Sequence, residues 1–162
     1  MTSSPAAVVA QRPIAPDVFT WPDEPAHLLG SRCDACATVV FPAQHGCPKC
    51  GVPGMARTTL SRRGTLWTWT TQDFLPKSPY AGPETEADFS GYLLGYVELP
   101  EGVRVITRLV DVDRAEVAIG MALELAIVPF NIDPDGTEVL AYAFRPVTAG
   151  GAASAPTSGL TR

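Results

Sequence analysis

The sequence has little charge of either sign and no excess of positive charge. Charged residues make up 18% of its 162 residues, and 12 Lys and Arg stand against 17 Asp and Glu, which gives a formal net charge of −5. Proteins that bind nucleic acid usually present a basic surface, so this balance argues against that class. No apolar run approaches the ~18 residues that a transmembrane helix needs, so we expect no membrane-spanning segment.

Cysteine is absent except between positions 33 and 50, where all four cysteines occur as CDACATVVFPAQHGCPKC. Two C-x-x-C pairs could form disulfides, a redox-active dithiol or a metal tetrathiolate. A disulfide between such close residues closes too short a loop to stabilise much. The start of the chain also lacks the basic and apolar regions of a secretory signal, so we expect a reducing cytoplasm. A thioredoxin-type site uses one C-x-x-C at a helix start, not two pairs.

The spacing therefore favours a metal tetrathiolate. Each C-x-x-C knuckle directs two sulfurs inward, and two knuckles complete a tetrahedron, with Cys33, Cys36, Cys47 and Cys50 as the ligands. Zinc prefers such a closed site, which has no open position for a catalytic water, so we predict one structural Zn²⁺. Iron in a rubredoxin-like site, as in an electron carrier, is the alternative that cysteine spacing alone does not separate.

Residues suited to catalysis are equally scarce. Of the two histidines, His45 lies between the cysteine pairs, where we interpret it as a loop residue, and His27 has no nucleophile near it in sequence. No G-x-S-x-G motif or phosphate-binding glycine loop occurs. Asp73 and Asp88 have the sequence surroundings of ordinary surface carboxylates. We therefore predict no catalytic residue in this chain.

Long helical patterns are missing, whereas proline (16) and glycine (14) are frequent, a composition that favours short strands and turns. One helical turn, capped by Asp111 or Asp113, is expected between the third and fourth strands of the region after the cysteines. Pro129 predicts a bulge or a sheet edge. Five strands with this small insertion predict an OB-fold barrel. The strand segments are GTLWTWTTQDF, YLLGYVEL, VRVITRLV, ALELAIVPF and TEVLAYAFRPV.

The composition divides the all-β chain into four segments. We expect an N-terminal arm with a short helix in PDEPAHLLGSR over residues 1–30, and a rubredoxin-like zinc ribbon over 31–55. The five-stranded OB-fold barrel follows over 56–147, and 148–162 form a flexible low-complexity tail.

Trp67 and Trp69 are two residues apart on the first barrel strand, so the period of a strand predicts that they share one face. We place that face in the barrel core or against the ribbon, because the neighbouring residues are threonines and not Lys or Arg. The alternative is an exposed stacking platform for a base or an acyl chain.

Taken together, in their order along the chain, the sequence motifs resemble those of a known family. The segments CDACATVVFPAQHGCPKCG, GTLWTWT, YLLGYVEL, VRVITRLV, VAIGM and AFRPV are similar to the acyl-CoA-associated zinc-ribbon/OB-fold family, also called domain of unknown function thirty-five, over roughly residues 21–147. Ala37 stands where the first knuckle of the family commonly has Gly, and Pro22 and Pro25 shorten the segment before the ribbon.

The resemblance implies a non-catalytic accessory subunit in acyl-CoA metabolism. Family members pair with thiolase-like proteins, either acyltransferases or retro-aldolases of steroid side chains, and others accompany enoyl-CoA hydratases. The partner would hold the catalytic residues, and this chain would support the assembly or the substrate channel. The competing hypothesis is a single-stranded nucleic-acid-binding protein, because zinc ribbons and OB-folds also occur in that machinery.

Two groups of residues are candidates for contacts with the partner or with acyl-CoA. The proline-rich segment 75–91 is long for a loop in a compact domain and carries aromatic residues, which often anchor interfaces. Guanidinium groups match the phosphate oxygens of coenzyme A. The candidates are Tyr80 and Phe89 in the segment, and Arg57, Arg62 and Arg63 after the ribbon.

Overall fold

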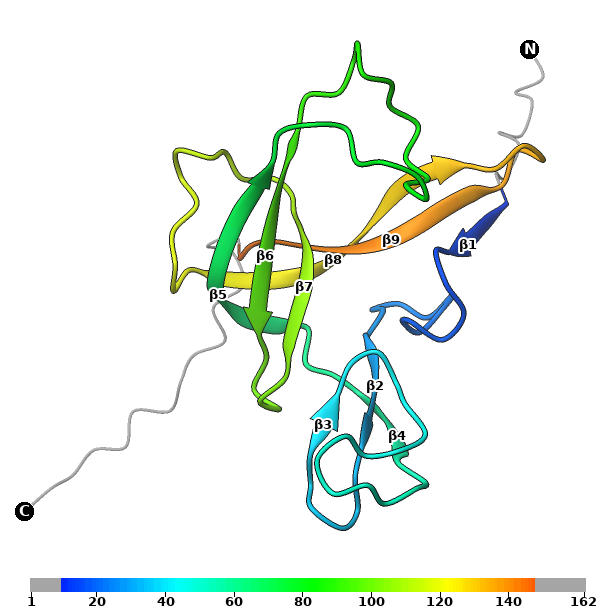
Figure 1. Ribbon diagram of the computed structural model, residues 1–162, viewed down its shortest axis with the longest axis vertical. Helices are drawn as coiled ribbons and strands as arrows, with labels where there is room; N and C mark the ends of the chain where they lie inside the picture. Colours follow the sequence, from blue (N-terminus) through cyan, green and yellow to red (C-terminus); the bar gives the residue numbers. More distant parts are fainter. Residues whose placement is uncertain (1–9, 148–162) are drawn as a thin grey trace, which may run out of the picture.

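The computed structural model describes residues 10–147, which contain nine β-strands and no helix (Figure 1). The predicted tail at 148–162 and the first nine residues of the arm lie outside the described residues. Within residues 10–147, no helix is long and apolar enough to cross a bilayer. The strands are β1 (Gln11–Pro13), β2 (Leu29–Arg32), β3 (Val39–Val40), β4 (Ala56–Thr59), β5 (Arg63–Gln72), β6 (Tyr92–Glu98), β7 (Arg104–Leu109), β8 (Ala122–Ile132) and β9 (Glu138–Pro146).

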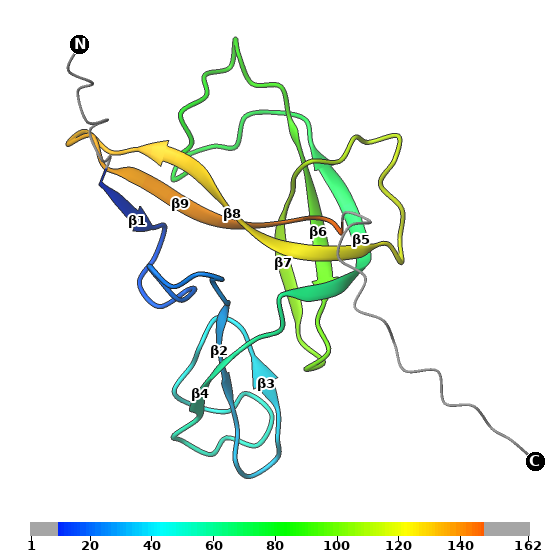
Figure 2. The ribbon, with the colours of Figure 1, turned by 180° about the vertical axis from the view of Figure 1, so that it is seen from behind.

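Strands β5 to β9 close into a barrel (Figures 1 and 2). Strands β5, β6 and β7 are neighbours in an antiparallel sheet, and β8 pairs with both β5 and β9. A short parallel pairing of Arg108 and Leu109 with Ala143 and Phe144 joins β7 to β9 and completes the ring. Closure leaves few free strand edges in the barrel. The all-β class and the five-stranded barrel are confirmed.

The turn chemistry of the β8–β9 hairpin follows from its sequence. The pairing register shifts between Pro129 and Asn131, as expected for a proline that cannot donate to the ladder. In the following turn, the Asp133 N–H donates to the Thr137 carbonyl at 2.8 Å, and Gly136 adopts a positive φ of 86°. Only glycine adopts that conformation at little cost, so the sequence NIDPDG was enough to predict this turn.

The N-terminal segment differs from the prediction of a short helix, which is wrong for the described residues. Strand β1 pairs in parallel with β9, and an isolated bridge joins Phe19 to Leu28. Pro22 and Pro25 lack the N–H groups that a helix would need there. The insertion between β7 and β8 contains a single turn, as predicted, in which the Val117 N–H donates to the Asp113 carbonyl at 3.0 Å.

The ribbon and the barrel share one hydrophobic core. Strands β3, β2 and β4 form the ribbon sheet, and buried residues at its barrel end continue into the barrel interior. Phe41 of the ribbon meets Tyr142 of β9 edge-on, with ring centroids 5.4 Å apart. The ribbon is therefore packed against the barrel. The most buried members of this core include Leu28, Leu60, Leu66, Val97, Leu123, Leu125 and Phe144.

Candidate metal centre and binding surfaces

The two cysteine knuckles have the same backbone geometry. The Ala37 N–H donates to the Cys33 carbonyl at 2.8 Å, and the Gly51 N–H donates to the Cys47 carbonyl at 2.9 Å. Both donors have a left-handed backbone, with φ values of 57° at Ala37 and 72° at Gly51. At Gly51 this conformation costs little, because glycine has no Cβ. The first knuckle requires the same conformation from an alanine, whose Cβ disfavours it.

The four sulfurs are close enough to bind one metal ion. The Sγ atoms of Cys33, Cys36, Cys47 and Cys50 all lie within 4.8 Å of one another. Two of the pairs, Cys33–Cys50 and Cys36–Cys47, are 3.6 Å apart. Tetrahedral zinc with bonds of ~2.3 Å to sulfur separates its ligands by about 3.8 Å, so the donor set fits zinc. Four protein ligands close the coordination sphere.

The pKa values of two of the thiols are shifted in opposite directions by their surroundings. The Thr38 hydroxyl, 3.2 Å from the Cys36 sulfur, lowers the pKa of that thiol to about 6. At Cys50 the Val52 N–H lowers the pKa, but the neighbouring thiols outweigh it and raise the pKa to about 12. Zinc binding requires deprotonated cysteines. A divalent cation at the centre would offset the repulsion between the thiolates.

Neither histidine belongs to the metal cluster. The imidazole of His45 is exposed, and its backbone carbonyl accepts a hydrogen bond from the Gly54 N–H at 2.7 Å. Nδ1 of His27 lies 3.1 Å from the Leu60 carbonyl, where the chain passes from ribbon to barrel. In residues 10–147 the four cysteines are the one group of three or more Cys, His, Asp or Glu side chains placed to hold a metal.

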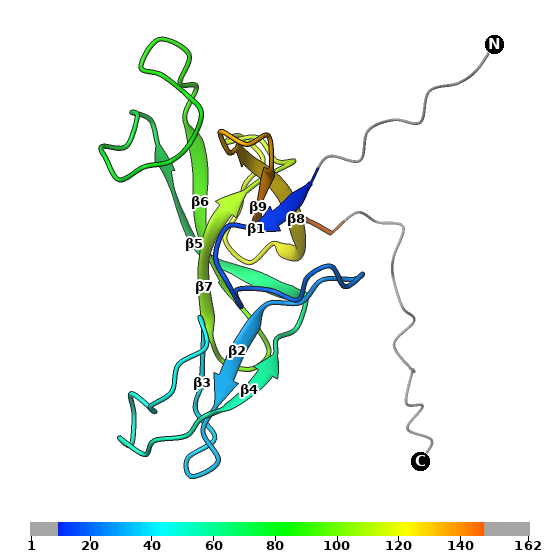
Figure 3. The same cartoon turned by 90° about the vertical axis from the view of Figure 1, so that its right-hand side faces the viewer.

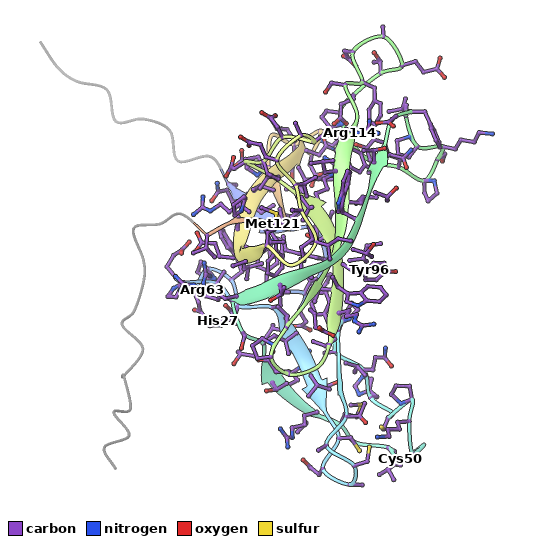
Figure 4. The ribbon with its side chains drawn as sticks, turned by 90° about the vertical axis from the view of Figure 1, so that its left-hand side faces the viewer. His27, Cys50, Arg63, Tyr96, Arg114 and Met121 are labelled. Carbon is purple, nitrogen blue, oxygen red and sulfur yellow. The ribbon has the colours of Figure 1, made fainter. Side chains whose placement is uncertain are left out.

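The predicted arginine cluster is divided among different contacts. Arg57 forms an ion pair with Asp17 at 2.6 Å, and the Arg57 guanidinium lowers the pKa of that carboxyl. Arg62 donates to the backbone carbonyls of Ala26 and, at 3.1 Å, Leu125, so it joins the N-terminal segment to β8. Arg63 begins β5, and Figure 4 shows it on the opposite side of the barrel from Tyr96.

The two aromatic residues singled out from sequence, Tyr80 and Phe89, anchor the segment between β5 and β6 through contacts within this chain. The Tyr80 hydroxyl accepts a hydrogen bond from Arg108 at 2.7 Å and donates one to Glu84 at 2.8 Å. Burial and the Glu84 carboxylate raise the pKa of Tyr80. Phe89 packs edge-on against Tyr92, with centroids 5.9 Å apart. Both rings are half-buried and hold the segment against the barrel.

Trp67 and Trp69 point to different environments, contrary to the expectation of a shared face. Trp67 is 46% exposed, whereas Trp69 packs against the hydrophobic core. A β-bulge between Leu66 and Thr68 explains the difference, because it inserts one extra residue and breaks the alternation of the strand. Trp67 instead lies edge-on to Tyr96, with centroids 6.2 Å apart.

Sequence reasoning also missed the residues that accompany Trp67 on the outer face of the barrel. Tyr96 of β6 pairs with Ile106 of β7, and Leu94 pairs with Arg108 two residues further along. The signal was present as period-two alternation in both strands. Because both segments are also rich in apolar residues on the inner face, the outer positions did not stand out.

Comparison with known proteins identifies the family of this chain. Residues 25–56 match the family model described as "ChsH2, rubredoxin-like zinc ribbon domain", and residues 57–128 match "ChsH2, C-terminal OB-fold domain". A DUF35 domain-containing scaffold protein of Methanocaldococcus jannaschii is 33% identical over 122 residues, which are 74% of this chain and 82% of that protein. The chain belongs to the DUF35 family. The zinc-ribbon match and the sulfur cluster together confirm the predicted structural zinc site.

Two further relatives of this DUF35 protein are subunits or chains of larger enzymes. The benzoylsuccinyl-CoA thiolase subunit BbsA of Thauera aromatica is 29% identical over 121 residues, covering 75% of this chain and 77% of BbsA. A chain of the solved Ltp2-ChsH2(DUF35) aldolase structure is 28% identical, with a TM-score of 0.55 over 74% of this chain and 84% of that one. The resemblance inferred from the motifs is confirmed.

Proposed function

We propose that this chain is a non-catalytic accessory subunit that docks on a thiolase-like acyl-CoA enzyme, either an aldolase or an acyltransferase, and supports its assembly or its substrate channel. The observation that carries the proposal is the likeness, over both ribbon and barrel, to a chain of the Ltp2-ChsH2(DUF35) aldolase. The benzoylsuccinyl-CoA thiolase subunit supports the same class of partner. Zinc thiolates need reduced cysteines, which supports a cytoplasmic setting.

The chemistry of the described residues agrees with a supporting role. A closed tetrathiolate site has no position for a water or a substrate. Asp73 accepts a hydrogen bond from the Thr71 hydroxyl at 2.7 Å, and Asp88 accepts one from the Thr85 N–H at 2.5 Å. Both carboxylates are exposed and serve local turns. In a complex of this kind the reacting groups would come from the partner.

The decisive experiment is purification of the tagged chain from its native host, followed by mass spectrometry of the proteins that remain bound. We expect a thiolase-fold protein in a fixed ratio to the bait, and acyl-CoA turnover when both proteins are combined. The same purification with an untagged chain is the control. Recovery of a monomer with no thiolase-fold companion would contradict the proposal.

Contacts with coenzyme A or with the partner by the residues singled out from sequence are part of this proposal. Because Arg57 and Arg62 already bind groups of this chain, a phosphate would have to compete with Asp17 or with backbone carbonyls. Calorimetric titration of coenzyme A into wild type and into single alanine variants tests these contacts. The residues to vary are Arg57, Arg62, Arg63, Tyr80 and Phe89.

A second candidate function is binding of single-stranded nucleic acid. The exposed rings of Trp67 and Tyr96 favour it, because bases stack on such platforms. The formal charge of −5 disfavours it. Fluorescence anisotropy with labelled single-stranded oligonucleotides separates the two functions: micromolar binding that weakens steeply as salt rises would support this candidate.

A further inference from the structure

The outer face of β5, β6 and β7 carries a group of large exposed apolar side chains. Trp67 is 46% exposed, Tyr96 41% and Ile106 51%. Tyr96 and Ile106 are cross-strand partners, and Tyr96 also meets the edge of Trp67. A shallow hollow of about 200 Å³ lies beside them, lined by Thr68, Trp69, Thr70, Leu94, Gly95, Tyr96 and Ile106.

The side chains of Trp67, Tyr96 and Ile106 are not part of the barrel core, which the opposite face of the same strands fills with buried residues such as Leu66, Val97 and Val105. Outward positions of an antiparallel barrel are ordinarily polar. Single exposed apolar residues are common and need no explanation, but three neighbouring ones, two of which line a hollow, indicate a binding surface. The bulge adds to this, because it leaves Trp67 outside the pairing of β5 with β6, next to the ring of Tyr96.

A guanidinium group with free hydrogen-bonding capacity borders the apolar group. Arg108 lies two residues beyond Ile106 on β7, about 7 Å along the strand. Its guanidinium carbon sits 3.8 Å from the centroid of the Tyr92 ring, and one of its nitrogens binds the Tyr80 hydroxyl at 2.7 Å. The ring and the hydroxyl therefore hold the guanidinium in one orientation, and Tyr80 is its one side-chain hydrogen-bond partner within residues 10–147.

No carboxylate of residues 10–147 pairs with Arg108, in contrast to its neighbour on the same strand face. Arg104 forms an ion pair with Glu98 at 3.0 Å and stacks on Trp67. A stacked, half-buried arginine without an acidic partner is suited to a planar carboxylate, which it can bind with two parallel hydrogen bonds. The charge on this face is thus complementary to an acidic side chain beside an apolar one. The arginines that form ion pairs within residues 10–147 include Arg12, Arg57, Arg104, Arg114 and Arg145.

The ribbon and the segment between β5 and β6 project on the same side as this face. Figure 4 places Tyr96 and Cys50 on one side of the molecule, with His27 and Arg63 on the other. In Figure 3 the cyan part of the ribbon and the green β5–β6 segment extend beyond the sheet in the same direction. A partner on this face would therefore be flanked by two further protein elements, as suits a macromolecule.

From these observations we infer that the outer face around Trp67, Tyr96 and Ile106 is the surface that holds the thiolase-like partner, and that it receives a segment of that protein with an apolar side chain next to an Asp or Glu. The apolar side chain enters the hollow beside Ile106, and the carboxylate binds Arg108. This inference rests on the proposed function and adds the surface and the chemistry of the segment that it binds.

The test uses the full-length chain and the thiolase-fold protein that co-purifies with it. Ile106→Asp should weaken the measured affinity at least 100-fold, and Arg108→Ala about 10-fold or more, with Arg108→Lys recovering only part of the loss because it lacks the planar fork. Ile119→Asp is the matched control, since Ile119 is 67% exposed in the β7–β8 loop, and should change affinity less than twofold. Zinc content and the unfolding midpoint verify that each variant is folded.

A second measurement does not depend on loss of binding. A benzophenone amino acid placed at position 106 should crosslink to the partner at a peptide that contains an apolar residue beside Asp or Glu, and the same group at position 132 should not. Wild-type affinity of Ile106→Asp would overturn the assigned surface and leave the proposed function standing. Absence of any thiolase-fold companion of the wild type would overturn the proposed function itself.

Evidence that either of two other molecules binds this face would also overturn the inference. Sedimentation that reveals a dimer of this chain, abolished by Ile106→Asp, would assign the face to a second copy. Calorimetry in which Ile106→Asp loses coenzyme A binding while its affinity for the partner is unchanged would assign the face to a small ligand.

Discussion

Glu101 and Ser61 are joined by two hydrogen bonds across 40 residues of sequence: Oε1 of Glu101 accepts from both the backbone N–H and the hydroxyl of Ser61, each at 2.7 Å. Ser61 lies where the chain passes from β4 of the ribbon to β5 of the barrel, and Glu101 lies in the β6–β7 turn. The second oxygen of Glu101, Oε2, is buried and has no hydrogen-bond partner among the described residues. One carboxylate therefore fixes the connection between the two parts of the molecule.

Removal of this carboxylate should destabilise the protein. Glu101→Ala leaves the Ser61 N–H without its acceptor, and hydrogen bonds to charged groups contribute about 1.5–3 kcal/mol, so we expect a loss of that size in the free energy of unfolding measured with urea. Glu101→Gln keeps an acceptor oxygen and should lose less. Glu86→Ala, in the β5–β6 segment, is the control and should be near neutral. Equal stability of Glu101→Ala and Glu86→Ala would contradict this account.

The two knuckles offer a matched pair of substitutions. Ala37→Gly should stabilise the zinc-loaded protein by about 0.5–1 kcal/mol, because it removes a left-handed alanine at the cost of a more flexible unfolded chain. Gly51→Ala should destabilise it by a similar amount. A Cβ at Gly51 meets no atom within 4 Å, so the cost there comes from the backbone alone. Thermal unfolding at saturating zinc measures both; a destabilising Ala37→Gly would show that the knuckles are not equivalent.

The different surroundings of Trp67 and Trp69 predict different effects of their removal. Trp69→Ala should cost about 3 kcal/mol, as for other large core residues. Trp67→Ala should cost about 1 kcal/mol or less, because it loses only the Tyr96 edge contact and the Arg104 stacking. Acrylamide should quench the fluorescence of a Trp69→Phe variant more strongly than that of Trp67→Phe. Equal costs and equal quenching would mean that Trp67 and Trp69 have the same surroundings in solution.

This bulge marks the limit of what the sequence could predict. The cysteine spacing, the five barrel strands and the Pro129 irregularity are local features, and each could be recognised from a short segment. A bulge depends on how β5 pairs with β6, which no single strand encodes. Likewise, the contacts of Arg62 with Ala26 and Leu125 join positions 36 and 63 residues apart, so the sequence offered only a basic run near the ribbon.

The ion pair between Arg57 and Asp17 gives the N-terminal segment a defined pH dependence. The guanidinium holds the pKa of Asp17 below its ordinary value in the folded protein. A lowered folded-state pKa means that the contribution of this pair to stability is present above the ordinary pKa and is lost as pH falls through the folded one. NMR titration of the Asp17 carboxyl should show the low pKa in wild type and a normal pKa in Arg57→Gln. The same titration curve in both would exclude the contact in solution.

Loss of the metal should weaken the barrel as well as the ribbon, because Phe41 of the ribbon contacts Tyr142 of β9 and both lie against the common core. We expect Cys36→Ser to bind no zinc and to lower the unfolding midpoint, since metal binding and ribbon folding are coupled. Amide hydrogen exchange should speed up in β9 near Tyr142 as well as in β2 and β3. Phe41→Ala separates the two effects: it should retain one zinc per chain yet raise exchange at Tyr142. If β9 exchanges at the wild-type rate in Cys36→Ser, the ribbon folds independently of the barrel, and the shared core does not transmit the effect of the metal.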